Sequence, residues 1–241
     1  MTIKPINSRT KLKFQINFFI FLSFCGLLLI TYIISQPNNE IRIAPEQDLP
    51  MYTSDKLHKT SEALPRVTDP NLRACIQAYH TTFTQQLTEL DCSQKEIASL
   101  NGLEYFTTLT EIDFWRNKIS DISPLKNLAV LKVIELSNNN IRDISVFKQL
   151  TALRELGLGG NNISNLEPLA KLNGLQELRL FNNKLTDISS LKQLTKLEIL
   201  LIDRNQLTDI SVIKHLTALR ELGLDSNQIK DISSLQSLML L

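Results

Sequence analysis

The feature that most limits how this chain can fold is an asparagine that recurs every 22 residues. It stands at Asn117, Asn139, Asn161, Asn183, Asn205 and Asn227. If each Asn is position 9 of its unit, apolar residues recur at positions 1, 4, 6, 11, 14, 17 and 20. In one unit these are Leu109, Ile112, Phe114, Ile119, Ile122, Leu125 and Leu128. A period of this length is typical of a solenoid built from stacked units.

Seven such units span 87–241, because counting back one period adds a degenerate first unit with Leu87, Leu90 and Cys92 at positions 1, 4 and 6. Positions 4 and 6 alternate as on one face of a strand, so each unit is predicted to add a strand to a parallel sheet. Burying seven apolar positions contributes on the order of 10–20 kcal/mol. Ordering the backbone of one unit costs roughly 20–40 kcal/mol. One unit therefore needs its neighbours, and the Asn side chain is predicted to satisfy backbone groups of adjacent coils.

Five units continue with Asp-Ile-Ser, at 121–123, 143–145, 187–189, 209–211 and 231–233. An Asp before a short helical turn acts as a cap, and Pro124 and Pro168 suit the start of such turns. Because capping explains these aspartates, we expect no calcium ladder. His58, His80 and His215 lack the spacing of metal ligands, so no metal or cofactor is predicted.

The repeat L-x-x-L-x-L-x-x-N-x-I-x-D-I-S-x-L resembles the bacterial internalin-like class of 22-residue leucine-rich repeats, which is shared with a eukaryotic phosphatase-regulator type. Asp69 to Ile76 resembles the N-terminal cap helix of exported bacterial members. The resemblance covers roughly 69–241. It implies an α/β solenoid: a right-handed leucine-rich repeat horseshoe with a parallel β-sheet on the concave face and short 3-10 turns and loops on the convex face. It also implies that the concave face binds another protein.

The two ends of the repeat array differ. In the cap region, 66–86, Leu72, Cys75, Ile76 and Tyr79 lie at helical spacing, and Cys92 occupies a core position of the first repeat. Cys75 and Cys92 should meet at this boundary, either as a disulfide or as two buried free thiols. The last repeat ends in apolar residues with no recognisable cap. We expect a docking surface, an end-to-end dimer or a shortened version of a longer protein there.

The pattern of the N-terminal segment predicts a membrane signal-anchor. Residues 1–13 are basic, and 14–34 carry no charge over 21 residues, which as a helix spans roughly 30 Å. This predicts a single-pass membrane protein with a cytoplasmic N-terminus and periplasmic or extracellular repeats. The alternative is a cleaved signal and a secreted protein. Residues 35–65, with four prolines, are predicted to form a stalk.

Positions 3, 5, 7 and 8 should face the concave solvent. Over seven repeats they carry ten acids and three Arg, which favours a protein partner with a basic surface and argues against nucleic acid. Glycines at 157, 159 and 160 should leave a shallow gap. The predicted partner-binding residues are Trp115, Arg116, Arg179, Phe181, Ile199, Leu201, Asp203, Arg204, Glu111, Asp113, Glu135, Glu155 and Glu177. Among them, exposed aromatic and Arg side chains are common in interface hot spots.

No catalytic motif accompanies this surface. The sequence has no G-x-S-x-G, phosphate loop or zinc spacing, and an open row of carboxylates offers no enclosed pocket for acid–base chemistry. We therefore predict a non-catalytic, membrane-anchored, exported leucine-rich repeat module that binds protein for adhesion, envelope scaffolding or sensing. The alternative is a cytoplasm-facing regulatory subunit that wraps an enzyme such as a phosphatase.

Overall fold

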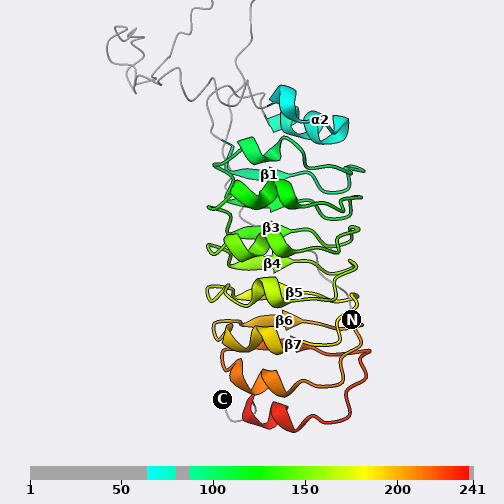
Figure 1. The fold of residues 1–241 in the computed structure, drawn as a ribbon, viewed down its shortest axis with the longest axis vertical. Helices are drawn as coiled ribbons and strands as arrows, with labels where there is room; N and C mark the ends of the chain where they lie inside the picture. The colour runs from blue at the N-terminus through cyan, green and yellow to red at the C-terminus, as the bar shows by residue number, and fades with distance from the viewer. Residues whose placement is uncertain (1–63, 80–86, 239–241) are drawn as a thin grey trace, which may run out of the picture. The chain divides into compact units, whose positions relative to one another are not determined.

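The computed structural model describes residues 64–79 and 87–238, and in the second range the chain stacks as a solenoid (Figure 1). Each repeat adds one three-residue strand to a single sheet, in which the strands lie in chain order and all neighbours are parallel. The strands are β1 (Glu89–Asp91), β2 (Glu111–Asp113), β3 (Val133–Glu135), β4 (Glu155–Gly157), β5 (Glu177–Arg179), β6 (Ile199–Leu201) and β7 (Glu221–Gly223).

The pairing register of the sheet equals the sequence period. Ile112 of β2 pairs with Leu90 of β1 and with Ile134 of β3, each 22 residues away. Equivalent positions therefore form columns across the strands. The columns at positions 4 and 6 are buried in repeats one to six, as Ile112 and Phe114 illustrate at 0% exposure, and half-buried in repeat seven, because alternate residues of a strand point to opposite faces.

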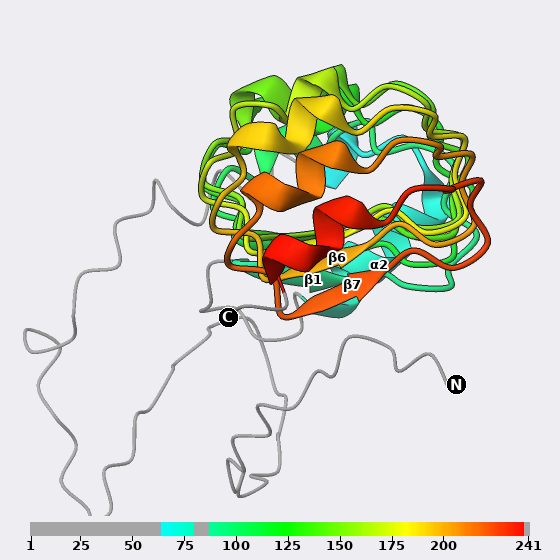
Figure 2. The same ribbon diagram turned by 90° about the horizontal axis from the view of Figure 1, so that it is seen from below.

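Short 3-10 helices line the side opposite the sheet (Figure 2). In five repeats the Asp at position 13 accepts a hydrogen bond from the N–H two residues on, as in Ser123 N to Asp121 Oδ1 at 2.8 Å. This Asx turn leads the chain into the helix. The helices are η2 (Leu64–Arg66), η3 (Leu103–Tyr105), η4 (Ser123–Asn127), η5 (Ser145–Gln149), η6 (Glu167–Leu169), η7 (Ser189–Gln193), η8 (Ser211–His215) and η9 (Ser233–Leu238).

The recurring Asn joins adjacent coils, as its spacing predicted. Asn139 Oδ1 accepts the N–H of Ile119 in the preceding repeat at 2.9 Å. Its Nδ2 donates to Phe114 O in that repeat and to Leu136 O in its own, both at 3.0 Å. Because Asn139 is buried, these bonds satisfy backbone groups that water cannot reach.

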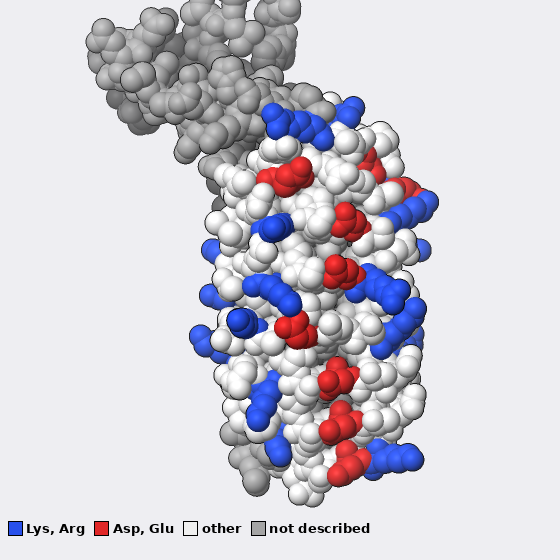
Figure 3. Space-filling model, in the orientation of Figure 1, with Lys and Arg blue, Asp and Glu red and all other residues white. Residues whose placement is uncertain are grey.

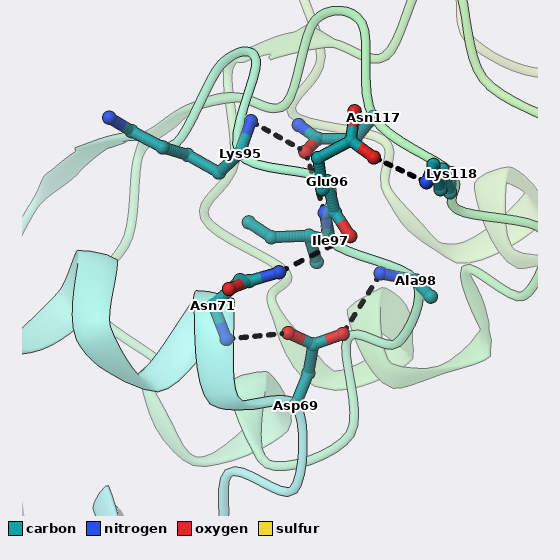
Figure 4. A network of polar contacts seen from close by, with 8 residues as sticks. All are labelled: Asp69, Asn71, Lys95, Glu96, Ile97, Ala98, Asn117 and Lys118. Carbon is teal, nitrogen blue, oxygen red and sulfur yellow. Dashed lines mark hydrogen bonds and ion pairs between the residues drawn. The ribbon is translucent and has the colours of Figure 1, made fainter.

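The helix α2 (Pro70–Tyr79) covers the β1 end of the solenoid. Asp69 anchors it: Oδ1 accepts from the N–H groups of Asn71 and Leu72 at 2.9 and 3.0 Å, and Oδ2 from Ala98 and Ser99 at 2.9 and 3.1 Å. Figure 4 shows the bonds from Asn71 and Ala98. Burial by itself would raise the pKa of Asp69, but the four backbone donors outweigh it and lower the pKa. One carboxylate thus caps the helix and ties it to the first repeat.

A second link between α2 and the sheet runs through its last turns. Cys75 and Cys92 form a disulfide, with Cα atoms 5.9 Å apart. Leu72 and Ile76 are fully buried against the first repeat. Tyr79 shares their helical spacing but is 40% exposed, and its hydroxyl accepts the Asp91 N–H at 2.9 Å at the edge of β1. The cap therefore covers both the core and an unpaired strand edge.

The predicted fold class is corrected in one element, the membrane helix. Among residues 64–79 and 87–238, no helix has the length and apolar character needed to cross a bilayer. The signal-anchor predicted at 14–34, the basic segment 1–13 and most of the stalk lie outside the described residues. The expected single-pass localisation therefore has no support in the described fold, which consists of the cap helix and the solenoid.

Candidate functional site: the solvent face of the sheet

The candidate site is the sheet face, by which we mean the side chains at positions 3, 5, 7 and 8 of the seven repeats. Positions 3 and 5 lie on the strands and positions 7 and 8 on the turns that follow them. At position 8 the backbone is left-handed in every repeat, with φ of 53–65°. Repeat four has Gly160 there, whereas repeats two and six have Arg116 and Arg204, so a recurrent backbone turn holds these exposed cations at fixed places.

Carboxylates stack over β1, β2 and β3. We call this group the acidic ladder: Glu89, Asp91, Glu111, Asp113 and Glu135. The register sets Glu89 beside Glu111, and Asp91 beside Asp113, which in turn lies beside Glu135. Neighbouring strands are about 4.8 Å apart, so like charges meet at close range.

The stacking changes the acidity of the ladder. Burial raises the pKa of Asp113 to about 6, and the charges of Asp91, Glu135 and Glu111 add to the effect, although a hydrogen bond from the Trp115 N–H opposes it. Burial and the charges of Glu89 and Glu155 also raise the pKa of Glu111. Part of the negative charge therefore titrates in the mildly acidic range.

The middle of the sheet face is less open than the sequence predicted. Glu135 is only 6% exposed, because its carboxylate lies over Gly157 of the next strand. The ring of Phe181 lies over Gly159 in the same way. Ser137, also buried, accepts the Gly159 N–H at 3.0 Å on its hydroxyl. The glycines of repeat four are thus covered by neighbouring side chains and leave no gap.

Apolar and cationic side chains gather over β5 and β6. We call this group the mixed patch: Arg179, Phe181, Ile199, Leu201 and Arg204. The first four are half-buried, and Arg204 is exposed. In the register Arg179 lies beside Leu201, so its guanidinium borders the apolar surface.

An ion pair within β5 holds the Arg179 side chain of the mixed patch. Arg179 forms an ion pair with Glu177 of the same strand, with 22% and 14% of their side chains exposed. Burial raises the pKa of Glu177, and the charge of Arg179 opposes the rise. Arg179 Nη1 is buried without a hydrogen-bond partner among the described residues. The mixed patch therefore presents the ion-paired guanidinium of Arg179 beside aliphatic and aromatic side chains.

The remaining predicted contact residues lie apart from the mixed patch. Trp115 is half-buried on the β2 side, with the Arg116 guanidinium 5.9 Å from its ring centroid. Glu155 lies between the two groups on β4. Asp203 accepts the Asp225 N–H at 2.9 Å and covers Gly223. No group of three or more His, Cys, Asp or Glu side chains in the described ranges is arranged to hold a metal ion.

Comparison with known families agrees with this geometry. Residues 107–163 match the family model described as leucine rich repeat, and 173–215 and 195–237 match the model described as leucine rich repeats in two copies. The chain is a leucine-rich repeat protein. Leucine-rich repeat domains generally bind protein partners, and the sheet face is the surface that all seven repeats build together.

Solved structures support the same assignment. The leucine-rich repeat protein is similar to internalin C2 of Listeria monocytogenes strain 4b F2365, with 28% identity over 73% of this chain and 92% of that chain and a TM-score of 0.57. A leucine-rich repeat protein of Leptospira interrogans shares the fold, with 22% identity over 62% of this chain and 46% of that chain and a TM-score of 0.54. The search of curated proteins gives no match. The resemblance to the internalin-like class is confirmed.

Proposed function

We propose that this leucine-rich repeat protein is a non-catalytic binding module whose sheet face takes a protein partner with Lys and Arg side chains. The observation that carries the proposal is the presence of two complementary surfaces on one continuous sheet. The acidic ladder covers β1–β3, and the mixed patch lies over β5 and β6. Four strand steps separate β2 from β6, or roughly 19 Å at the usual strand spacing.

The acidic ladder supplies long-range attraction. Five carboxylates on three adjacent strands give this end of the sheet face a negative potential, which speeds association with a basic surface and weakens with salt. Because the pKa of Asp113 is raised to about 6, the ladder loses charge as the pH falls through that value. Association with a basic partner should slow over the same range.

The mixed patch supplies the short-range contact. Phe181 and Leu201 are held in place by their own packing, since both are half-buried in the free protein. Aromatic and Arg side chains that are already ordered lose little conformational entropy on binding, which is why they dominate interface energies. A partner that places aliphatic side chains over Leu201 and a carboxylate near Arg204 would satisfy this surface.

Catalysis is not part of the proposal. The carboxylates of the sheet face lie on an open, solvent-facing sheet, and several of them accept hydrogen bonds from backbone N–H groups of their own repeat, as Asp113 does from Trp115. These hydrogen bonds give the carboxylates a structural role as acceptors for the backbone. An open surface also gives little exclusion of water, which acid–base chemistry on a bound substrate needs.

The test uses random twelve-residue peptides displayed on phage and selected on the full chain. The recovered peptides should be rich in Lys and Arg, and the Phe181→Ala, Leu201→Ala double variant should bind them about thirtyfold more weakly, as expected for hot-spot residues. Lys126→Ala, at the end of η4 on the opposite side, is the matched control and should leave affinity unchanged. Peptides without basic enrichment would contradict the charge argument.

Equal affinity of the double variant, with an unchanged far-UV circular dichroism spectrum, would contradict the role of the mixed patch. Arg204→Ala provides a second variant that does not disturb packing, because Arg204 is exposed. It should also weaken binding.

A further inference from the structure

A polar groove lies on the flank of the solenoid, in the loops that lead from the strands to the 3-10 helices. Its volume is about 340 Å³, and it is lined by Asn140, Arg142, Asn162, Ser164 and Lys184. These residues come from repeats three, four and five. All five side chains carry N–H or O–H donors, and none is a carboxylate. The lining is therefore suited to a ligand rich in acceptors.

The two cations bracket the shorter residues of the groove. Arg142 belongs to repeat three and Lys184 to repeat five, with Asn162 and Ser164 of repeat four between them. At one strand spacing per repeat, two repeats separate the cation-bearing loops by roughly 10 Å. The groove is therefore lined by a guanidinium-bearing side chain from one side and an ammonium-bearing side chain from the other.

Neither cation is neutralised within the described part of the chain. Other cations on this flank and the adjoining helices do form ion pairs, for example Lys118 with Glu96 and Lys148 with Glu167. The ion pairs found in the described ranges include neither Arg142 nor Lys184. Because neither side chain is held in an ion pair there, their donors remain available to a ligand.

The sequence removes a negative charge beside the groove. At position 13 repeats two, three, five, six and seven carry Asp, but repeat four carries Asn165, directly after Ser164. Asn165 accepts the Glu167 N–H at 2.9 Å, so it makes the same turn without the charge. In Figure 3 the column of carboxylates on the helix-bearing side is offset partway along, where one carboxylate lies to the side of the column, and Lys and Arg side chains lie at the nearby edge.

We propose that this groove binds a phosphate or sulfate group carried on a small hydroxylated molecule. Arg142 and Lys184 bind the oxyanion through charge-assisted hydrogen bonds. The amides of Asn140 and Asn162 and the hydroxyl of Ser164 bond to the hydroxyl groups of the ligand. The volume lies at the small end of ligand sites and fits a sugar-sized molecule. The groove is built from loop residues outside the sheet face, so this inference is independent of the protein-binding proposal.

The test is isothermal titration calorimetry on the full chain at low ionic strength, with glucose 6-phosphate, inorganic phosphate and glucose as separate probes. Glucose 6-phosphate should bind most tightly. The double variant Arg142→Gln, Lys184→Gln should weaken its binding by about tenfold or more, because both charge-assisted contacts are lost. Lys230→Gln, at position 12 of repeat seven and thus equivalent to Arg142, is the control and should leave the affinity unchanged.

A second variant tests the charge pattern without removing any donor from the groove. Asn165→Asp restores the carboxylate found in the other repeats and keeps the turn, so the thermal unfolding temperature should stay the same. Binding of glucose 6-phosphate should weaken by about threefold, the size expected for an exposed like charge.

Three results would overturn the proposal: no saturable binding of glucose 6-phosphate, glucose binding equally well, or equal affinity in the Arg142→Gln, Lys184→Gln variant. If inorganic phosphate binds as tightly as glucose 6-phosphate, the role of the two cations is supported and the role of the amides and the hydroxyl is refuted.

Discussion

Replacement of the recurring asparagine at position 9 in the middle of the solenoid should cost far more stability than the same change in repeat seven. In Asn161→Ala the Ile141 N–H loses its acceptor at 2.9 Å and has no other. The carbonyls of Leu136 and Leu158 each lose one of two amide donors, because the Asn residues of the neighbouring repeats, Asn139 and Asn183, still donate to them.

The magnitude follows from these three groups. An orphaned buried N–H costs about 1–3 kcal/mol, and each carbonyl that keeps one donor loses about 0.5–1 kcal/mol. The expected loss in the free energy of unfolding is therefore about 2–5 kcal/mol. Asn227 makes the same pattern of bonds, to Leu207, Ile202 and Leu224. It is only half-buried, so water can replace the amide, and Asn227→Ala should cost about 1 kcal/mol.

The assay is urea unfolding of the full chain, followed by far-UV circular dichroism and by the fluorescence of Trp115, the single tryptophan. Coincident transitions would justify treating each variant as two-state, and the shift of the midpoint then reports the change in stability. Equal midpoint shifts for Asn161→Ala and Asn227→Ala would refute the argument from burial, as would a shift for Asn161→Ala below about 1 kcal/mol.

Three further changes test other parts of the fold. Asp69→Ala should destabilise the protein by about 2–4 kcal/mol near neutral pH, since four backbone donors lose their acceptor. Because the folded-state pKa of Asp69 is lowered, its contribution should be present above about pH 4 and fade as the pH falls further; a pH-independent difference from wild type in urea unfolding would be inconsistent with this. Asp113 has a raised folded-state pKa of about 6, so its ionisation destabilises the folded state progressively as the pH rises from about 4 to about 6, and fully above that range. Asp113→Asn keeps an acceptor for Trp115 and should raise stability at pH 7 by about 1 kcal/mol, with about half of that gain at pH 5 and almost none near about pH 3; a larger gain at pH 5 than at pH 7 would reverse the inferred sign. Gly159→Ala places a methyl group against the Phe181 ring and should lower stability by about 1–3 kcal/mol; Phe181→Ala in the same chain should recover part of that loss, and no recovery would mean that the ring is not the obstacle.

The repeat core was predictable because each of its positions is specified six or seven times. The apolar columns, the strand at positions 3 to 5 and the role of the Asn all follow from local alternation and a constant period. Glu135 and Ser137 were misplaced because their burial depends on what stands 22 residues later. The signal was present, since Gly157 and Gly159 occupy the same positions one repeat on and leave room for a neighbouring side chain.

The flank groove was missed for a different reason. A repeat consensus averages over the units, whereas the groove depends on differences among three of them. At position 13, Asn165 is the one neutral residue among the aspartates of repeats two to seven. Because Asn and Asp both cap a turn, the capping argument drew no attention to this difference in charge. The membrane helix predicted at 14–34 rested on the length of the uncharged run and on the basic residues before it, and it lies outside the described residues.

The constant register has a consequence for how such a surface changes over time. Insertion or deletion of one whole repeat between β3 and β5 preserves every pairing in the sheet, because each strand contacts only its neighbours. It changes the separation between the acidic ladder and the mixed patch by one step of about 4.8 Å. The number of repeats therefore sets the distance between the two contact surfaces. A single recombination event between repeats can change this distance, and with it the partner that fits, while the residues that make the contacts stay the same.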